Sequence, residues 1–473
     1  MLSLPKHDVL IYSTFKRQPM NAKPLLLALL LLPGLIQAQP RPAPKKAAAA
    51  PARFDPRQRP RHLTDEQLLD LVQRQTFRYF WDFGHPASGM ARERSNVAYD
   101  YGNEVVTTGG TGFGIMAIIV AADRNWITRE QAATRLYKMV RWLEKADCYH
   151  GVFPHWLHGA TGKVIRFGAK DDGGDIVETS FLMEGLICAR QYFTGESAVE
   201  RDLRDHIGGM WENVEWNWQT QGGQNVLYWH WSPNNGWSMN HQIHGWNECL
   251  ITYVLAASSP RYAIDKPVYD QGWAVGPEFK NGREYYGIRL PLGPDLGGPL
   301  FFTHYSFLGL NPHGLKDQYA DYWTQNQNHT LINYQYCVEN PRHFKGYGPD
   351  TWGLTASDSY QGYAAHNPKE DLSVISPTAA LSAFPYSPEQ SMRALKHFYF
   401  DLGDKIWGEY GFVDGFSEEK NWQARSYLAI DQGPIVGMIE NYRTGLLWKL
   451  FMSSPDVRRG LGKLGFETGA GKK

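Results

Sequence analysis

The sequence has few cysteines and no excess of either charge. Cysteine occurs only at positions 148, 188, 249 and 337, and none of these forms a CxxC pair, so their spacing indicates no zinc or thioredoxin-type site. Four cysteines are too few for a disulfide framework in 473 residues, and we expect free buried thiols, with one bridge as the alternative. Lys and Arg number 48, as do Asp and Glu, so the formal net charge is zero. This balance excludes a strongly basic nucleic-acid-binding protein and a polybasic membrane-surface protein.

The sequence also lacks the short motifs that mark several enzyme classes, since it contains no GxSxG, P-loop or HExxH motif. The glycine-rich segment 109–114 has no preceding strand or βαβ context, so it predicts close helix packing or a backbone approach to a ligand rather than a phosphate-binding loop. His241 and His244 are three residues apart but have no third ligand at a recognisable spacing. The sequence therefore predicts neither a metal site nor a cofactor.

The N-terminal segment resembles a secretory signal. Residues 25–36 read LLLALLLLPGLI, follow Lys23 and precede Ala38. This apolar run is shorter than the roughly 20 residues that span a bilayer, so we expect no stable membrane insertion after cleavage. We expect a signal segment over 1–38, with Met20 as an alternative start, and export to the periplasm or beyond.

Composition then divides the rest of the chain. The Pro- and Ala-rich residues 39–61 predict a disordered linker. No second linker interrupts the remainder, so we expect one domain over 62–460, followed by a flexible tail over 461–473.

Helical patterns dominate residues 62–460. Capping boxes stand at Thr64–Gln67 and Thr128–Gln131, and each opens an amphipathic helix. Further apolar stripes at helical spacing run from Leu203 to Trp218 and from Met392 to Leu402. These patterns predict helices with one side against a core and the other in water.

Other helical segments are apolar on nearly every side, which is typical of buried helices. They are residues 111–122, 176–189, 247–257 and 433–451. Buried helices that alternate with amphipathic ones imply an inner ring inside an outer ring. We therefore predict an all-α fold, an (α/α)6 toroid, with long loops or short hairpins from 150–168 and 270–305 over the cleft face.

Aromatic residues are abundant: 17 Trp, 26 Tyr and 22 Phe make up 14% of the chain. Their rings stack on the C–H faces of sugars, so a Trp-rich cleft suits a carbohydrate. For any single ring, packing in the core is the alternative.

Acidic residues stand at the starts of the buried segments. Asp175 and Glu178 are one helical turn apart and project from one side of a helix start, where the helix dipole favours carboxylates. Glu248 precedes an apolar run and follows Trp246, so we predict a raised pKa that suits a general acid. Further candidates are Asp171, Asp358 beside Trp352, and Asp431. The alternative for each acid is a plain helix or turn cap.

Opposed carboxylates in an aromatic cleft are suited to cleavage of a glycosidic bond. One acid protonates the leaving oxygen, and the other activates water or attacks the anomeric carbon.

Several runs of the sequence match one known pattern. They are TTGGTGFG at 107–114, FPHW at 153–156, DDGGDIVETSFLMEGL at 171–186, WNE at 246–248, DTWGLTASD at 350–358 and DQGPIVGMIENYRTG at 431–445, with Asn96 and Tyr99 ahead of them. Together these runs, over roughly residues 65–453, resemble the bacterial glycoamylase-like family, glycoside hydrolase family 144. The resemblance implies an endo-β-1,2-glucanase with an (α/α)6 fold that inverts the anomeric centre and releases short sophoro-oligosaccharides.

The resemblance also implies which residues face the substrate. Our hypothesis makes Glu248 the general acid and assigns the water to Asp175, Glu178 or Asp431. The residues expected to bind substrate are Asp171, Trp156, His244, Trp246, Trp352, Asp358 and Tyr99.

Other functions remain as alternatives. One is an exo-acting hydrolase or a hydrolase for a differently linked β-glucoside on the same fold. Another is a non-catalytic glycan-binding protein of the periplasm. A polysaccharide lyase would need a basic cleft, and a sugar epimerase would use a histidine pair such as His241 and His244. In each case the expected partner is a glycan rather than a nucleic acid, and we expect a monomer.

Overall fold

The structure, a computed structural model, describes residues 55–96 and 103–469. The predicted signal segment 1–38, most of the predicted linker and the candidate residue Tyr99 lie outside the described residues.

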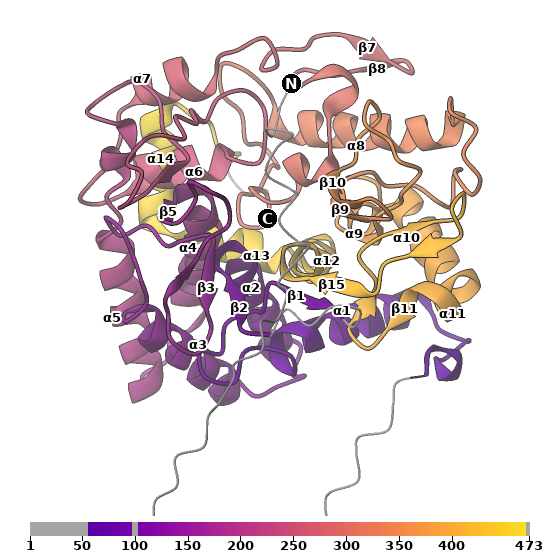
Figure 1. The fold of residues 1–473 in the computed structure, drawn as a ribbon, viewed down its shortest axis with the longest axis horizontal. Helices are drawn as coiled ribbons and strands as arrows, with labels where there is room; N and C mark the ends of the chain where they lie inside the picture. Colours follow the sequence, from indigo (N-terminus) through magenta and orange to yellow (C-terminus); the bar gives the residue numbers. More distant parts are fainter. Residues whose placement is uncertain (1–54, 97–102, 470–473) are drawn as a thin grey trace, which may run out of the picture. The chain divides into compact units, whose positions relative to one another are not determined.

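Buried and amphipathic helices alternate along the chain, which confirms the predicted all-α (α/α)6 toroid. The inner helices are buried along almost their whole length, and α12 lies near the centre of Figure 1. These inner helices are α2 (Thr108–Asp123), α4 (Ile176–Tyr192), α6 (Leu250–Ser258), α9 (Pro377–Leu381) and α12 (Ala429–Arg443).

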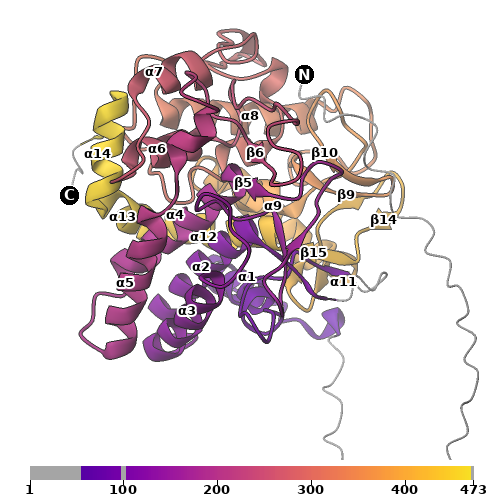
Figure 2. The same cartoon turned by 60° about the vertical axis from the view of Figure 1, so that its left-hand side comes forward.

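The outer helices bury one side only. Neighbouring outer helices pack on each other as well as on the core, as α3 and α5 do in Figures 1 and 2. The outer set is α1 (Asp65–Trp81), α3 (Arg129–Leu143), α5 (Ala198–Glu212), α8 (Tyr322–Glu339), α10 (Pro388–Lys396) and α14 (Pro455–Leu464). Among the described helices, none is both long and apolar enough to cross a membrane.

Local sequence explains where several helices begin and end. The predicted capping boxes at Thr64 and Thr128 are both formed. The predicted apolar segment 433–451 is two helices, because Gly445 adopts φ +69° and separates α12 from α13 (Leu446–Ser453). The predicted stripe 203–218 is also interrupted: α5 ends at Glu212, and a separate 3-10 turn, Trp216–Thr220, follows.

Short antiparallel strands precede three inner helices and bring their starts together. Strand β2 (Val105–Thr107) pairs with β3 (Trp156–His158), which pairs with β4 (Val164–Ile165), and β2 leads into α2. Strand β5 (Gly174–Asp175) pairs with β6 (His230–Trp231) and leads into α4. Strand β1 (Arg94–Asn96) pairs with β15 (Ser426–Leu428), which leads into α12. The predicted short hairpins over 150–168 and 270–305 are confirmed by β3–β4 and by β7 (Glu284–Tyr285) with β8 (Ile288–Arg289).

Both predicted ends of the domain are wrong by several residues. Before residue 62, the Arg59 side chain is buried and donates to the Tyr399 carbonyl at 2.8 Å. After residue 460, α14 continues to Leu464, and Phe466 packs on Tyr269. Apolar and hydrogen-bonded contacts therefore hold residues that composition alone had assigned to a linker and a tail.

The four cysteines are free, as predicted. Three of them are buried, but the prediction of a buried thiol is wrong for Cys148, which is exposed in the loop after α3.

The inner helices α2 and α4 touch through their backbones at two glycines. A Cβ at Gly112 would lie 2.0 Å from the Phe181 carbonyl oxygen, and one at Gly185 would lie 2.2 Å from the Gly112 carbonyl oxygen. The prediction of close helix packing for segment 109–114 is thus confirmed.

We expect Gly112→Ala to destabilise the fold by about 3 kcal/mol or more, because two backbones in the core would have to separate. The matched control is Gly208→Ala in the interior of α5, where an added Cβ has no heavy atom within 4 Å. That change should stabilise the protein by about 0.5–1 kcal/mol, through helix propensity. Thermal and urea unfolding of both variants would check this, and equal effects would contradict the close approach.

Candidate active site

Asp175 is both the N-cap of α4 and the centre of a polar cluster. Its Oδ1 accepts the backbone N–H groups of Val177 and Glu178, each at 2.9 Å. Its Oδ2 accepts from the Trp229 indole at 3.2 Å and lies 3.2 Å from Nδ1 of His155. One oxygen of Asp175 therefore caps α4, while the other belongs to the polar cluster.

Glu178 lies one turn further along α4 and closes against the start of α2. Its Oε2 accepts the Gly109 N–H at 2.7 Å, and its Oε1 lies 3.8 Å from Nε2 of His155. Burial raises the pKa of Glu178 and the charge of Asp175 adds to this, while His155 opposes both. Gly109 has no Cβ, and one there would lie 2.7 Å from this carboxylate. The glycine-rich segment thus gives Glu178 a backbone donor.

His155 bridges these two acids. Burial lowers the pKa of the imidazole, but Glu178 and Asp175 outweigh burial and raise the pKa to about 9. The ring is therefore an imidazolium at neutral pH. Its face stacks on Phe167 at 4.0 Å between ring centroids, and Phe167 is 48% exposed. Trp156 meets the edge of Phe167, so the predicted residue Trp156 belongs to an aromatic rim beside the carboxylates.

Glu248 lies just before α6 and is half-buried. Burial raises its pKa to about 7, and the negative charges of Asp175 and Glu178 contribute to the rise. The predicted raised pKa is confirmed, and the fold brings the start of α6 close enough to the start of α4 for the three acids to interact.

A second acidic group surrounds the start of α12. Asp431 and Asp414 are both buried, and the Asp358 N–H donates to Asp414 at 2.6 Å. Arg94 donates to both oxygens of Asp358 at 3.0 Å, and Ser426 donates to Asp358 as well. Tyr305 interacts electrostatically with both acidic groups: burial raises its pKa well above the ordinary range, and Asp431 and Glu248 both contribute.

Three predicted substrate-binding residues have other roles in the structure. Trp352 is fully buried and its indole donates to the Gln390 carbonyl, so the prediction that it forms a sugar subsite is wrong. Trp246 is 2% exposed and stacks on Tyr322, so it also packs in the core. The carboxylate of Asp358 is held by Arg94 and Ser426 rather than being open to a sugar.

One other predicted residue, Asp171, lies near the carboxylate cluster, since its charge contributes to the raised pKa of His155. Asp171 pairs with Nε2 of His230 at 3.0 Å, next to Trp231 of β6. His244 is exposed. His241 instead stacks on Trp229, the indole that donates to Asp175.

Sequence reasoning missed His155, Trp229, Arg94 and Asp414. His155 stands inside the FPHW run, so its position beside Trp156 was a signal. The others left no signal, because each reaches the site through a pairing between strands or loops that are distant in the sequence.

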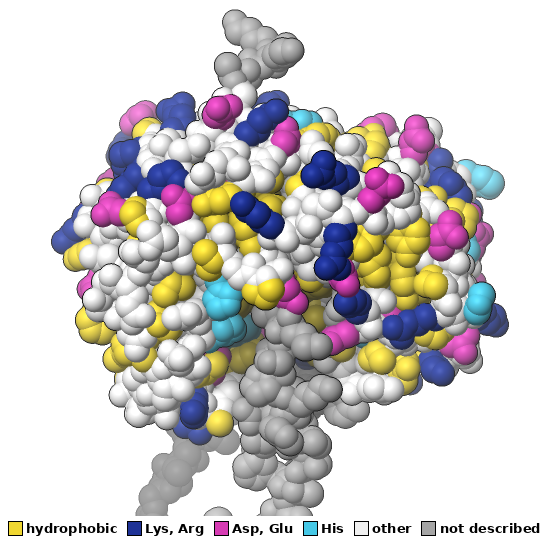
Figure 3. Space-filling view, turned by 90° about the horizontal axis from the view of Figure 1, so that it is seen from above, with side chains coloured by type: hydrophobic (Ala, Val, Ile, Leu, Met, Phe, Trp, Pro, Cys, Tyr) yellow, Lys and Arg dark blue, Asp and Glu magenta, His cyan; other side chains and the backbone are white. Residues whose placement is uncertain are grey.

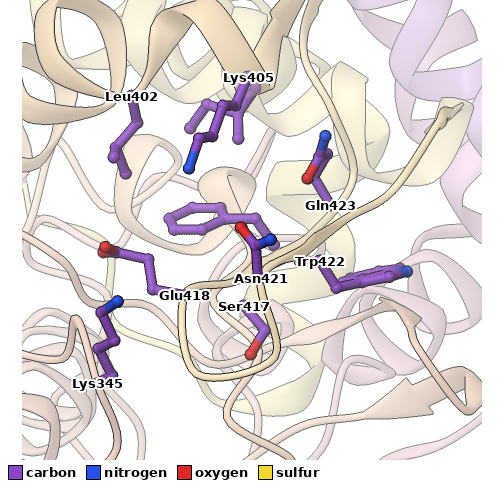
Figure 4. A pocket seen from close by; sticks show the side chains of 10 residues that line it. Lys345, Leu402, Lys405, Ser417, Glu418, Asn421, Trp422 and Gln423 are labelled. Atoms are coloured by element: carbon purple, nitrogen blue, oxygen red, sulfur yellow. The ribbon is translucent and has the colours of Figure 1, made fainter.

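The pocket in Figure 4 is separate from these acids. It is lined by Lys345, Leu402, Lys405, Ile406, Phe416, Ser417, Glu418, Asn421, Trp422 and Gln423. Among the described residues, no group of three or more His, Cys, Asp or Glu is placed to hold a metal ion.

Three comparisons with known proteins agree with one another. A family model described as "Putative glucoamylase" matches residues 240–455. The chain is 47% identical over 423 residues to an exo-β-1,2-glucooligosaccharide sophorohydrolase (non-reducing end) of Parabacteroides distasonis, covering 85% of this chain and 58% of that protein. It is 56% identical to the solved endo-β-1,2-glucanase from Chitinophaga pinensis, a sophorotriose and glucose complex, with a TM-score of 0.84 over 86% of this chain and 99% of that one. A β-1,2-glucanase structure from Parabacteroides distasonis is 46% identical, with a TM-score of 0.83 over 85% of this chain and 60% of that one.

Proposed function

Because the chain belongs to the glycoamylase-like family, glycoside hydrolase family 144, we propose that it is a glycosidase that hydrolyses β-1,2-glucan. The observation that supports this most directly is Glu248, whose pKa of about 7 leaves it able to donate a proton near neutrality. A second set of buried acids, Asp431 and Asp414, contributes together with Glu248 to the raised pKa of Tyr305. Two separated carboxyl groups are what a hydrolase needs to protonate a leaving oxygen and to activate water.

Glu248 serves as the general acid in this proposal, and Asp431 receives the proton of the attacking water. Asp175 and Glu178 are less suited to that second role, because backbone N–H groups and His155 already occupy their oxygens. Asp431 has neither oxygen hydrogen-bonded to a donor of the described residues. Hydrolysis then proceeds by single displacement, and the product has the inverted anomeric configuration.

Endo action is the first candidate mode. The endo-acting relative is 56% identical and is matched over 99% of its length. Exo action is the second candidate, since the sophorohydrolase is 47% identical, although this chain spans only 58% of that protein.

The charge around the site favours a neutral sugar. The side chains that meet there are mostly acidic, with Arg94 and His155 already paired to carboxylates. A lyase for acidic sugars would need the opposite charge. On the face drawn in Figure 3, acidic and basic side chains are interspersed, with no large patch of one sign.

Time-resolved product analysis on linear β-1,2-glucan tests the proposal, with β-1,3-, β-1,4- and α-1,4-glucans as controls. We expect hydrolysis of the β-1,2 polymer alone, an early fall in polymer size and a spread of short oligomers. Release of disaccharide from a polymer that shortens slowly would establish exo action instead. Proton NMR of the first products reports their anomeric configuration, and no reducing ends from β-1,2-glucan would contradict the proposed function.

We also propose that the protein acts as a monomer in the periplasm or outside the cell, which rests on the signal-like segment 1–38. N-terminal sequencing of the exported protein and its mass in solution would check both points.

A further inference from the structure

Asp431 and Asp414 are buried carboxyl groups that lack ordinary donors. Asp431 is 3% exposed and Asp414 is 4% exposed. Three of their four carboxyl oxygens receive no hydrogen bond from an N–H or O–H group of the described residues: both oxygens of Asp431 and Oδ1 of Asp414. The remaining oxygen of Asp414, Oδ2, accepts the Asp358 N–H at 2.6 Å. A buried carboxylate without a donor is costly, and two in one place would also repel each other.

The two carboxyl groups contact each other. Each lies within hydrogen-bonding reach of the other, although a carboxylate pair can form that bond only if one partner carries a proton. The pairing of β1 with β15 and the turn before β13 (Phe416–Ser417) bring Asp414 to the first turn of α12, where Asp431 lies. The Asp414 N–H also donates to the Ser426 carbonyl at 3.0 Å, which holds Asp414 at the start of β15.

The neighbouring charges do not neutralise a second negative charge at this pair. Arg94 donates to Asp358 and to Glu93, and its charge also lowers the pKa of Asp414 and of Asp431, but the pKa of each remains raised. The other titratable groups that face the pair are Tyr305, Tyr363 and Tyr79, which are neutral at pH 7. One proton shared between Asp414 and Asp431 allows the two carboxyl groups to form a hydrogen bond, and it reduces their combined charge from two negative charges to one.

We propose that Asp414 is a positioning residue for Asp431: the two carboxyl groups hold a single proton between them, and the pair, with one negative charge, accepts the proton of the attacking water. This inference rests on the proposed function. As the water oxygen bonds to the anomeric carbon, the glycosidic C–O bond breaks. The water proton passes to the pair, which becomes neutral, and the Glu248 proton passes to the leaving oxygen. Exchange with solvent then returns a proton to Glu248 and removes one from the pair.

The direction of the pKa shifts agrees with this arrangement. Burial and the repulsion of neighbouring acids raise the pKa of Asp414 to about 7, and the pKa of Asp431 is raised well above its ordinary range by burial and by Asp414. In a coupled pair of this kind, the first proton leaves readily because the shared hydrogen bond stabilises the single negative charge, and the second is held strongly.

The test compares Asp414→Asn and Asp431→Asn with a matched control, Asp371→Asn. Asp371 is also a buried acid with a raised pKa, but its oxygens accept from Tyr336, Tyr347 and the Ser373 N–H. Calorimetric unfolding near pH 7 in two buffers of different ionisation enthalpy counts the protons released. We expect each pair variant to release one proton fewer than the parent and Asp371→Asn to release the same number. If either pair variant folds and releases as many protons as the parent protein, the two carboxyl groups do not share a proton. If Asp414→Asn does not fold, Asp431→Asn alone provides this test.

Activity gives the second readout. The acid limb of the pH–rate profile reports the first proton to leave the pair, whose pKa the shared hydrogen bond lowers. Without the Asp414 carboxyl group this stabilisation of the Asp431 anion is lost. The limb should therefore move to higher pH by about one unit in Asp414→Asn and further in Asp414→Ala. It should not move in Asp371→Asn. A profile of Asp414→Asn that superimposes on that of the parent would overturn the positioning role. Failure of the parent to cleave β-1,2-glucan would contradict the proposed function instead, and the proton count would still report on the pair.

Discussion

Glu248→Gln is expected to lower kcat on β-1,2-glucan by about 10²–10⁴-fold while the protein remains folded, because the amide has no proton to give to the leaving oxygen. Initial rates by reducing-end assay, with a circular dichroism spectrum of the variant, measure this effect. The substrate should still bind, so a short sophoro-oligosaccharide should retain its affinity within a few fold by calorimetry.

The pKa of Glu248 also predicts the pH dependence of the parent. Because the acid must be protonated and its pKa is about 7, kcat/KM should fall as the pH rises through 7. In Glu248→Gln the residual activity should no longer show this fall at alkaline pH, the alkaline limb of the pH–rate profile. If the parent protein keeps full activity well above pH 8, Glu248 is not the general acid.

The same shift has a consequence for stability. The pKa of Glu248 is raised in the folded protein from an ordinary value of 4.5 to about 7. The folded state therefore holds a proton that the unfolded state releases, and its stability falls as the pH rises from about 4.5 to 7. Above pH 7 the ionised acid costs roughly 3 kcal/mol. Glu248→Gln should therefore be more stable than the parent at pH 8 but not at pH 4.

The matched control for this variant is Glu184→Gln. Glu184 is fully buried in the same inner ring, and its Oε1 accepts the Gly309 N–H at 2.8 Å. Burial raises the pKa of Glu184 well above its ordinary range, which favours the neutral acid, so the neutral glutamine is a close substitute. Activity should stay near the parent level. An equal loss in both variants would show that any buried Glu-to-Gln change inactivates the protein.

Asp175→Asn is expected to have the next largest effect, a loss of about 100-fold in kcat/KM with little change in stability. Asparagine is as good an N-cap as aspartate, so its oxygen keeps the N–H groups of Val177 and Glu178. The amide nitrogen, however, faces the Trp229 indole N–H, and His155 loses one of its two acidic partners. Both changes loosen the groups that surround the candidate reaction centre.

The electrostatic part of this prediction can be measured separately. Removing the charge of Asp175 should lower the pKa of His155 below about 9 and that of Glu248 below about 7, because Asp175 contributes to both shifts. The alkaline limb should therefore move to lower pH. Histidine titration by NMR and the pH–rate profile check the two shifts.

Asp321→Asn is the control for helix capping. Asp321 caps α8 in the outer ring, where it accepts the Thr324 N–H at 3.0 Å. That variant should keep full activity. Asp175→Ala, by contrast, should lose about 1–2 kcal/mol of stability as well as activity, since alanine cannot cap. If Asp175→Asn is as active as Asp321→Asn, then Asp175 is only a cap.

The sequence by itself determined the alternation of helices. A segment that is apolar all round, such as 111–122, must be buried whatever its partners are, and a stripe such as that of α1 must face a core. Capping at Thr64 and Thr128 depends on residues three positions apart, so it was also predictable. The positions of acids such as Asp175 and Asp431 at the starts of buried helices could also be read from the sequence, because the start of a helix is a local feature of the chain.

Only the tertiary structure decided which aromatic and acidic residues reach the site. Trp352 and Trp156 look alike in sequence, yet one is core and the other lies on the rim, because burial depends on the neighbours that distant loops supply. The pKa of Glu248 depends on Asp175 and Glu178, about seventy residues earlier, and the contact of Asp414 with Asp431 depends on how the loop before β13 packs on α12. Helix periodicity is a local property of the chain, whereas charge coupling requires a distance in space, and this is why the first could be predicted and the second could not.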